Sequence, residues 1–186
     1  RNFINSTYSI MSFLPKKISV PLRRKIINHS INNLKNKNFL HDKIEFKIIK
    51  TCYDLNFDND IKEKYSFLTN NEIKFLKSEF IKTTINSFKI EKNATSKLNN
   101  LDNQWNKIKK MKISNLQKIT KIIPILKKYG TLTFANSARA GFISISILKS
   151  LIQKKIINKK EFNNFMFSVN TISKEYLNDL YLLKNL

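Results

Sequence analysis

The sequence holds very little cysteine, glycine or proline. Its single cysteine, Cys52, excludes an intrachain disulfide and favours a reducing compartment. Two glycines and three prolines leave no flexible linker and no proline-rich spacer. No apolar run reaches the roughly 20 residues that span a bilayer, because the best stretch, 141–152, is interrupted by serines and a lysine. We therefore expect a cytoplasmic chain with no membrane partner.

Acidic residues are also scarce, so the net charge is strongly positive, at +22. Lysine, isoleucine and asparagine are abundant, at 31, 27 and 25 residues, whereas arginine and glycine number only four and two. A mutational bias toward AT-rich codons would produce all of these deviations together. A dedicated nucleic-acid binder would favour arginine, which grips phosphate and guanine bidentately, and would cluster its charge. The scattered lysines predict no dedicated nucleic-acid partner, although a basic surface attracts polyanions non-specifically.

Hydrophobic periodicity predicts a mainly α-helical chain, arranged as a multi-helix orthogonal bundle. Three capping signatures precede apolar residues at helical spacing and predict helix starts at 69–72, 114–117 and 158–161. Within the helix expected after the second signature, Pro124 should cause a kink or a break, because it lacks an N–H to donate. Gly130 is expected to end that helix, since glycine suits a left-handed cap.

One segment departs from the helical pattern. Ile44, Phe46 and Ile48 alternate with charged residues, which is the period-two pattern of a half-buried strand. We therefore predict one short strand or hairpin near residues 43–53. The aspartate-rich segment that follows, 54–60, lacks the glycine and the final glutamate of a calcium-binding loop. It is expected to be a solvated turn.

Small residues crowd the stretch from Tyr129 to Leu151, which contains both glycines. Glycine inside a helix costs about 1 kcal/mol relative to alanine, so we expect another backbone or a ligand to approach closely here. Arg139 lies among these small residues, and an arginine kept in a lysine-rich chain favours a planar bidentate donor. Arg139 is a candidate contact for phosphate or carboxylate. The alternative is a structural ion pair with a buried acid such as Asp42 or Glu45.

A second candidate is the polar cluster of His41, Asp42 and Glu45 at the start of the predicted strand. A histidine beside carboxylates can perform acid–base chemistry or bind a metal, but a loop histidine that caps a strand is the alternative. Two histidines without zinc spacing predict no metal site. Cys52 has no neighbouring base and is expected to be a small buried residue. Because no phosphate loop or nucleophile elbow is present, no catalytic residue is assigned.

Three stretches resemble bacterial proteins related to phosphoenolpyruvate synthase and pyruvate phosphate dikinase. They are HDKIEFKIIKTCYDLNF at 41–57, YGTLTFANSARAGFISISILKSL at 129–151 and FMFSVNTIS at 165–173. The resemblance implies a phosphotransferase with an ATP-binding domain, a swivelling phosphohistidine domain and often a barrel for phosphoenolpyruvate. The matching stretches resemble the helical region between or beside those domains and contain no catalytic signature. Thr133 stands where the family has proline, and threonine can cap the same helix.

Residues 1–186 are therefore expected to form a single helical domain. Because the chain begins at Arg1 and ends inside a predicted helix, we expect an internal fragment of a larger protein. Its expected function is to connect and position mobile catalytic domains of an ATP-dependent phosphotransferase, with those domains as its partners. The resemblance implies ATP and Mg²⁺ for the whole protein and no cofactor for this segment. The alternative is a stand-alone basic helical module that binds nucleic acid or acts as an adaptor.

Overall fold

The structure is a computed structural model that describes residues 5–169 and 171–184. Every regular element in these ranges is helical, which confirms the mainly α class. The elements are α1 (Ser6–Phe13), α2 (Val20–Asn36), η1 (Asn38–Leu40), η2 (Ile44–Ile48), α3 (Phe57–Lys64), α4 (Asn70–Glu91), α5 (Ala94–Lys109), α6 (Asn115–Ile125), η3 (Leu126–Thr131), α7 (Leu132–Gln153), α8 (Lys159–Ser168) and α9 (Ile172–Lys184). Among the described residues, no helix combines the length and the apolar character needed to cross a membrane.

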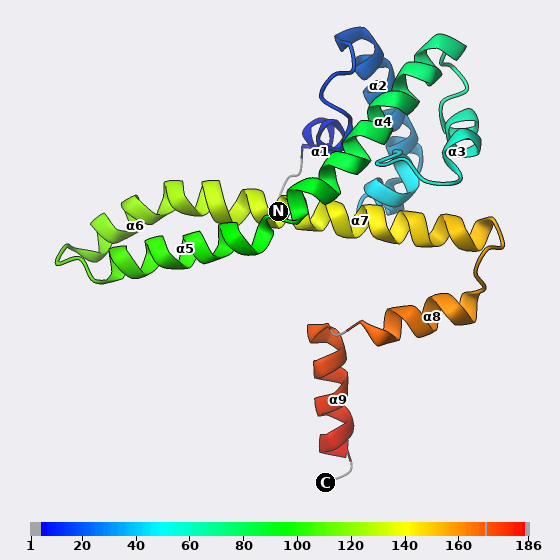
Figure 1. The fold of residues 1–186 in the computed structure, drawn as a ribbon. Helices are drawn as coiled ribbons and strands as arrows, with labels where there is room; N and C mark the ends of the chain where they lie inside the picture. Colours follow the sequence, from blue (N-terminus) through cyan, green and yellow to red (C-terminus); the bar gives the residue numbers. More distant parts are fainter. Residues whose placement is uncertain (1–4, 170, 185–186) are drawn as a thin grey trace.

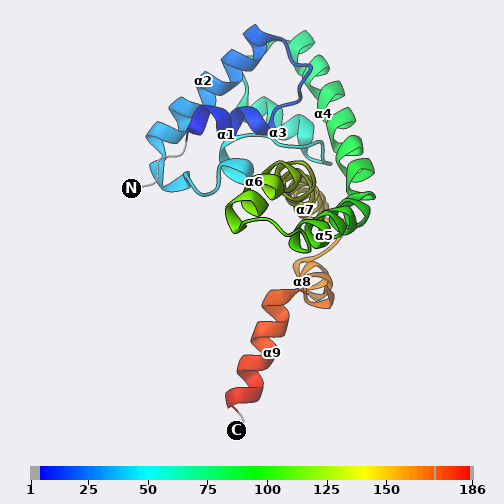
Figure 2. The same ribbon diagram turned by 90° about the vertical axis from the view of Figure 1, so that its left-hand side faces the viewer.

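Helices α1 to α4 and the turn η2 enclose the main hydrophobic core, and we call this part the head (Figure 2). Phe57, Tyr65 and Phe80 are its largest fully buried side chains. The rings of Phe57 and Phe80 pack edge to face with centroids 5.6 Å apart. Burial of these three aromatic side chains contributes strongly to the stability of the head.

Helices α6 and α7 are joined by the π-helical turn η3 and form one long rod (Figure 1). Of the two outcomes predicted at Pro124, a kink or a break, the break does not occur, because Pro124 lies inside α6. The predicted helix end at Gly130 is wrong. The N–H of Leu126 donates to the carbonyls of Ile122 and Ile123, so helical bonding resumes directly after the proline. Gly130 has no left-handed φ angle and lies within η3. The π turn keeps the chain helical through Gly130 and leads directly into α7.

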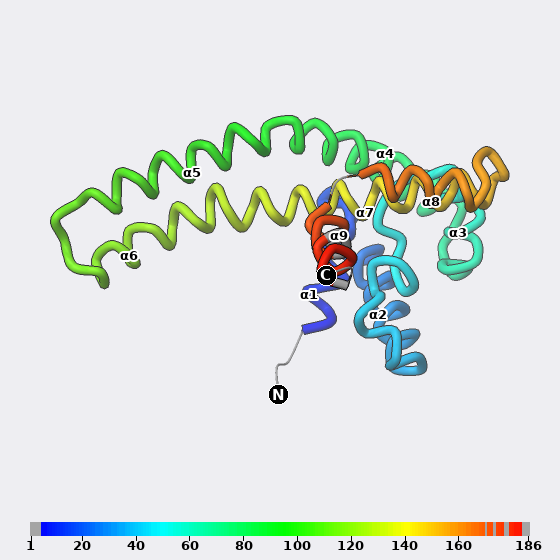
Figure 3. The backbone as a smooth tube through the Cα atoms, turned by 90° about the horizontal axis from the view of Figure 1, so that it is seen from below, coloured from blue at the N-terminus to red at the C-terminus, as the bar shows by residue number. Residues whose placement is uncertain are grey.

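The rod supports the other parts of the molecule. The head packs against α7 through α4, while α5 packs beside α6 and η3 to form a hairpin that points away from the head (Figures 1 and 3). After the far end of α7 the chain turns, so that α8 runs back below α7 and contacts it, and α9 then extends away from the rest of the structure (Figure 1). Helix α7 therefore connects the head, the hairpin and the C-terminal helices.

The predicted strand near residues 43–53 is wrong, because Ile44 to Ile48 form the π-helical turn η2. The N–H of Ile49 donates to the carbonyl of Ile44 at 3.0 Å, which satisfies these backbone groups locally. Ile44 and Ile48 are both buried and lie four residues apart. Their spacing fits one side of a helical turn as well as one face of a strand, so the alternation alone was ambiguous.

The three capping signatures are confirmed at the starts of α4, α6 and α8. In the first, Thr69 Oγ1 accepts the N–H of Glu72 at 3.3 Å, while the Glu72 carboxylate accepts the N–H of Thr69 at 2.9 Å. Thr133 does not act as a cap, because it is buried inside α7. The rod's continuity through η3 removes the free helix end that Thr133 would have capped.

Gly141 in α7 does not lie at a close approach between backbones. A methyl group at this position would meet no atom within 4 Å beyond its own helix, and the residue is exposed. The buried side of α7 is instead formed by Ala140 and Ile143. The expectation of tight packing is therefore wrong at Gly141, although α7 does lie against the head.

We expect Gly141→Ala to stabilise the isolated chain by about 1 kcal/mol, since alanine favours the helix and the space is open. Urea denaturation followed by circular dichroism measures this change. Ala135→Gly, at an exposed position of the same helix, is the matched control and should reduce stability by a similar amount. A less stable Gly141→Ala variant would contradict the open position.

Candidate functional site

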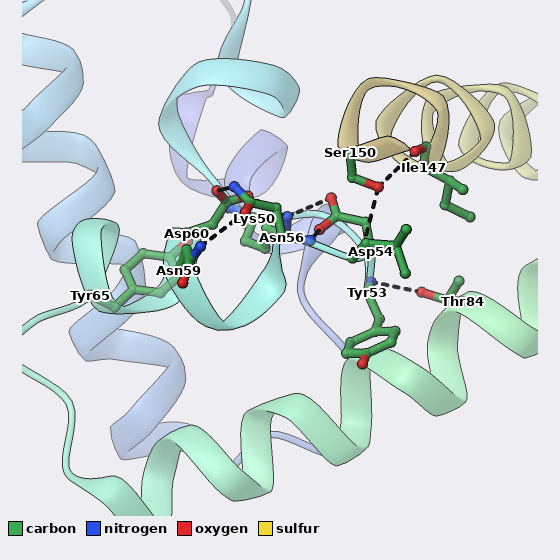
Figure 4. Close-up of polar contacts among 11 residues, drawn as sticks. Lys50, Tyr53, Asp54, Asn56, Asn59, Asp60, Tyr65, Thr84, Ile147 and Ser150 are labelled. Carbon is green, nitrogen blue, oxygen red and sulfur yellow. Dashed lines mark hydrogen bonds and ion pairs between the residues drawn. The ribbon is translucent and has the colours of Figure 1, made fainter. Parts of the chain in front are cut away.

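The connection from η2 to α3 is an irregular segment held between α4 and α7 (Figure 4). On one side, the N–H of Tyr53 donates to Thr84 Oγ1 of α4 at 2.9 Å. On the other, the N–H of Leu55 donates to Ser150 Oγ of α7 at 3.3 Å. Because these buried hydroxyls replace the missing partners of secondary structure, the segment can lie inside the protein.

A buried lysine organises this segment. Lys50 Nζ lies 2.6 Å from Asp54 Oδ2 and 2.5 Å from Asp60 Oδ2. The side chains of Lys50 and Asp54 are each only 6% exposed. Asn56 donates its backbone N–H to Asp54 Oδ1 at 3.1 Å and its side-chain amide to Asp60 Oδ1 at 2.8 Å. Both carboxylates thus gain further hydrogen bonds, as charges removed from water require.

Tyr65 joins this network from the core of the head. Its hydroxyl accepts the backbone N–H of Lys50 at 3.1 Å, and its ring is fully buried. Burial raises the pKa of Tyr65 to about 12, so the phenol stays neutral at physiological pH. Its geometry and protonation suit a structural hydrogen bond.

A cavity of about 170 Å³ lies beside the network. Its lining includes Lys47, Lys50, Cys52, Lys64, Ser146 and Lys149. Burial lowers the pKa of Lys64, partly opposed by attraction to Asp60. Burial also raises the pKa of Cys52, which disfavours the thiolate and confirms a buried, unactivated cysteine. The cavity can accommodate a small polar group, but its lining does not form an activated nucleophile.

The predicted polar cluster is not brought together. His41 is exposed, with Nδ1 3.0 Å from the carbonyl oxygen of Asn38, and Asp42 is also exposed. Glu45 is half-buried and lines the cavity. Within residues 5–169 and 171–184, no hydrogen bond or ion pair joins His41, Asp42 and Glu45. Among the same residues, no group of three His, Cys, Asp or Glu side chains could hold a metal ion.

Arg139 connects two helices of the fold. Its guanidinium is half-buried and donates through Nη2 to the backbone carbonyl of Ser12, in the last turn of α1. Burial lowers the pKa of Arg139. No acid, including Asp42 and Glu45, pairs with it in the part of the chain that the structure describes. Its position suits a helix C-terminus, where carbonyl groups are unsatisfied and the dipole is negative.

Sequence reasoning missed the role of the aspartates at 54–60. Asp54 is buried and Asp60 half-buried, so the expectation of a solvated turn is wrong for both. Asp58 is exposed and pairs with Lys77 of α4 at 2.7 Å. The four-residue spacing of Lys50 and Asp54 was the available signal, but it is common in a lysine-rich chain and does not reveal burial.

We expect Lys50→Met to destabilise the chain by about 3–5 kcal/mol, because it leaves two carboxylates unpaired in a buried environment. Lys77→Met, which breaks the exposed pair with Asp58, is the matched control and should change stability by less than about 1 kcal/mol. Urea denaturation at pH 7 compares the two variants. Equal effects would show that the buried pair makes no special contribution.

Comparisons with known proteins identify no relative of this chain. No protein-family model, no curated protein and no solved structure matches it. The resemblance to the phosphoenolpyruvate synthase family rests on the three quoted stretches alone. The observations that bear on function are therefore the fold, the buried network around Lys50 and the exposed surfaces.

Proposed function

We propose that this chain is a helical connecting domain of a cytoplasmic, ATP-dependent phosphotransferase of the phosphoenolpyruvate synthase type. Its role is to hold mobile catalytic domains in position, so that a phosphoryl group moves between sites protected from water. Support comes from the three stretches of resemblance and from one structural observation, the exposed apolar surface of its C-terminal helices.

Helices α8 and α9 carry large apolar side chains that the rest of the structure does not cover. Phe167 is 72% exposed and Ile172 is 84% exposed. Other exposed apolar side chains on these helices are Phe165, Met166, Tyr176, Leu180, Tyr181, Leu182 and Leu183. No residue of α8 is buried. An apolar surface of this extent favours a protein partner, and docking against a neighbouring domain would remove it from water.

The buried polar side chains also support a structural role. The buried network of Lys50, Asp54 and Asp60 is saturated with internal partners, and Arg139 is used to join α1 and α7. Catalytic work needs a nucleophile, a base and charge stabilisation arranged around a common point. The proposal therefore assigns ATP, Mg²⁺ and the phosphohistidine to other domains.

The alternative from the sequence, a stand-alone nucleic-acid-binding or adaptor module, draws support from the many exposed lysines. Single-stranded nucleic acid is bound by basic grooves with aromatic platforms on which bases stack. The exposed apolar side chains of the lysine-rich α5–α6 hairpin include one aromatic ring, Trp105, and are otherwise mainly aliphatic, among them Leu116, Ile119, Ile123 and Leu126. These side chains favour a protein partner over a nucleic acid.

The test uses the complete product of the gene that encodes this chain. We expect it to transfer phosphate from ATP to an internal histidine, detected as an acid-labile ³²P label. The double variant Phe167→Asp/Ile172→Asp should lower kcat at least about tenfold, because charges on the docking surface misplace the catalytic domains. The KM for ATP should not change, since this surface does not bind nucleotide.

Val20→Asp/Phe39→Asp is the matched control, because both side chains are exposed on the head. It introduces the same charges and should leave kcat within about twofold. A complete product without ATP-dependent phosphorylation would exclude the phosphotransferase. Equal effects of the two double variants would exclude a specific role for α8 and α9.

A further inference from the structure

The hairpin formed by α5 and α6 concentrates positive charge. Residues 94–131 contain nine lysines and one acidic residue, Asp102, which gives a net charge of +8. One fifth of the chain therefore carries more than one third of its net charge. The excess charge here comes from the scarcity of acidic residues as well as from the number of lysines.

This charge is not neutralised within the fold. Among the described residues, all five ion pairs lie in the head, between residues 25 and 82. In the hairpin, Lys118 Nζ donates to the carbonyl of Lys109 at 3.2 Å, and the Lys128 ammonium lies 5.2 Å from the ring centre of Tyr129. Because the hairpin points away from the head (Figure 3), its lysines repel one another and attract an acidic partner.

Apolar side chains accompany these lysines. Leu116, Ile119, Ile123 and Leu126 are spaced three and four residues apart, so they form one exposed stripe along the helix. Between α5 and α6 lies a groove of about 350 Å³, lined by Leu101, Asp102, Trp105, Ile122 and Leu126. The hairpin thus offers an apolar groove on a strongly basic element.

We propose that the α5–α6 hairpin binds an acidic amphipathic helix of a partner protein or domain. The apolar side chains of that helix would enter the groove around Trp105, while its carboxylates would face the hairpin lysines. The inference extends beyond the connecting role, because it names the chemistry of a partner. It does not depend on the phosphotransferase assignment.

The combination of charge and shape distinguishes this partner from other polyanions. A lipid headgroup surface would use the lysines and the exposed stripe, but it has no ridge of side chains to fill a groove between two helices. A nucleic acid would use the lysines, but the apolar lining is mainly aliphatic rather than aromatic. An acidic helix uses the groove and the charge together.

The test measures fluorescence anisotropy of a labelled designed peptide, about 20 residues long, with leucines at helical spacing and glutamates on its other face. We expect the chain to bind it, and the triple variant Lys107→Glu/Lys121→Glu/Lys128→Glu to weaken binding at least about tenfold. Lys17→Glu/Lys35→Glu/Lys62→Glu changes the net charge equally at exposed positions of the head. This control should weaken binding less than about twofold, because charges beyond a Debye length are screened.

Leu126→Ser removes an exposed apolar side chain of the groove without changing any charge, and it should weaken binding by about threefold or more. Circular dichroism checks that each variant remains helical. Equal weakening by the two lysine variants would overturn the proposal, since it would reveal only general attraction. The proposal would also be overturned if the chain bound phosphatidylserine vesicles or random RNA more tightly than the acidic peptide at about 0.15 M salt.

Discussion

The ammonium of Lys50, held between the carboxylates of Asp54 and Asp60, keeps an irregular segment inside an otherwise helical protein. That segment is bonded to α4 through Thr84 and to α7 through Ser150. The segment thus adds hydrogen bonds between the head and α7, which continues into α6 at one end and leads to α8 at the other.

Local signals in the sequence predicted where α4, α6 and α8 begin. In each capping signature, the two side chains that bond the helix start lie three residues apart. The helix start therefore depends little on contacts with the rest of the chain. The strand near 43–53 failed because the spacing of Ile44 and Ile48 fits both a strand face and a helical turn. Gly130 did not end the helix, because its local preference was overridden by a π turn and by packing of α5 beside it.

The site was harder to predict because its contacts join distant parts of the chain. Arg139 was selected as a contact for phosphate or carboxylate, but its partner in the structure is a backbone carbonyl in α1, and no side-chain pattern identifies such a partner. Burial of Cys52 was predicted from the absence of a neighbouring base. Burial of Lys50 was not, because its surroundings come from α3 and α7 as well as from its own segment.

The exposed surfaces of α8, α9 and the hairpin make sense if other domains or proteins cover them. Hydrogen exchange measured by mass spectrometry tests this account most directly, by comparing the isolated chain with the complete gene product under identical conditions. The account predicts slower amide exchange in α8 and α9 of the complete product, where a neighbouring domain covers them, with unchanged exchange in the head. Identical exchange of these helices in both proteins would contradict it.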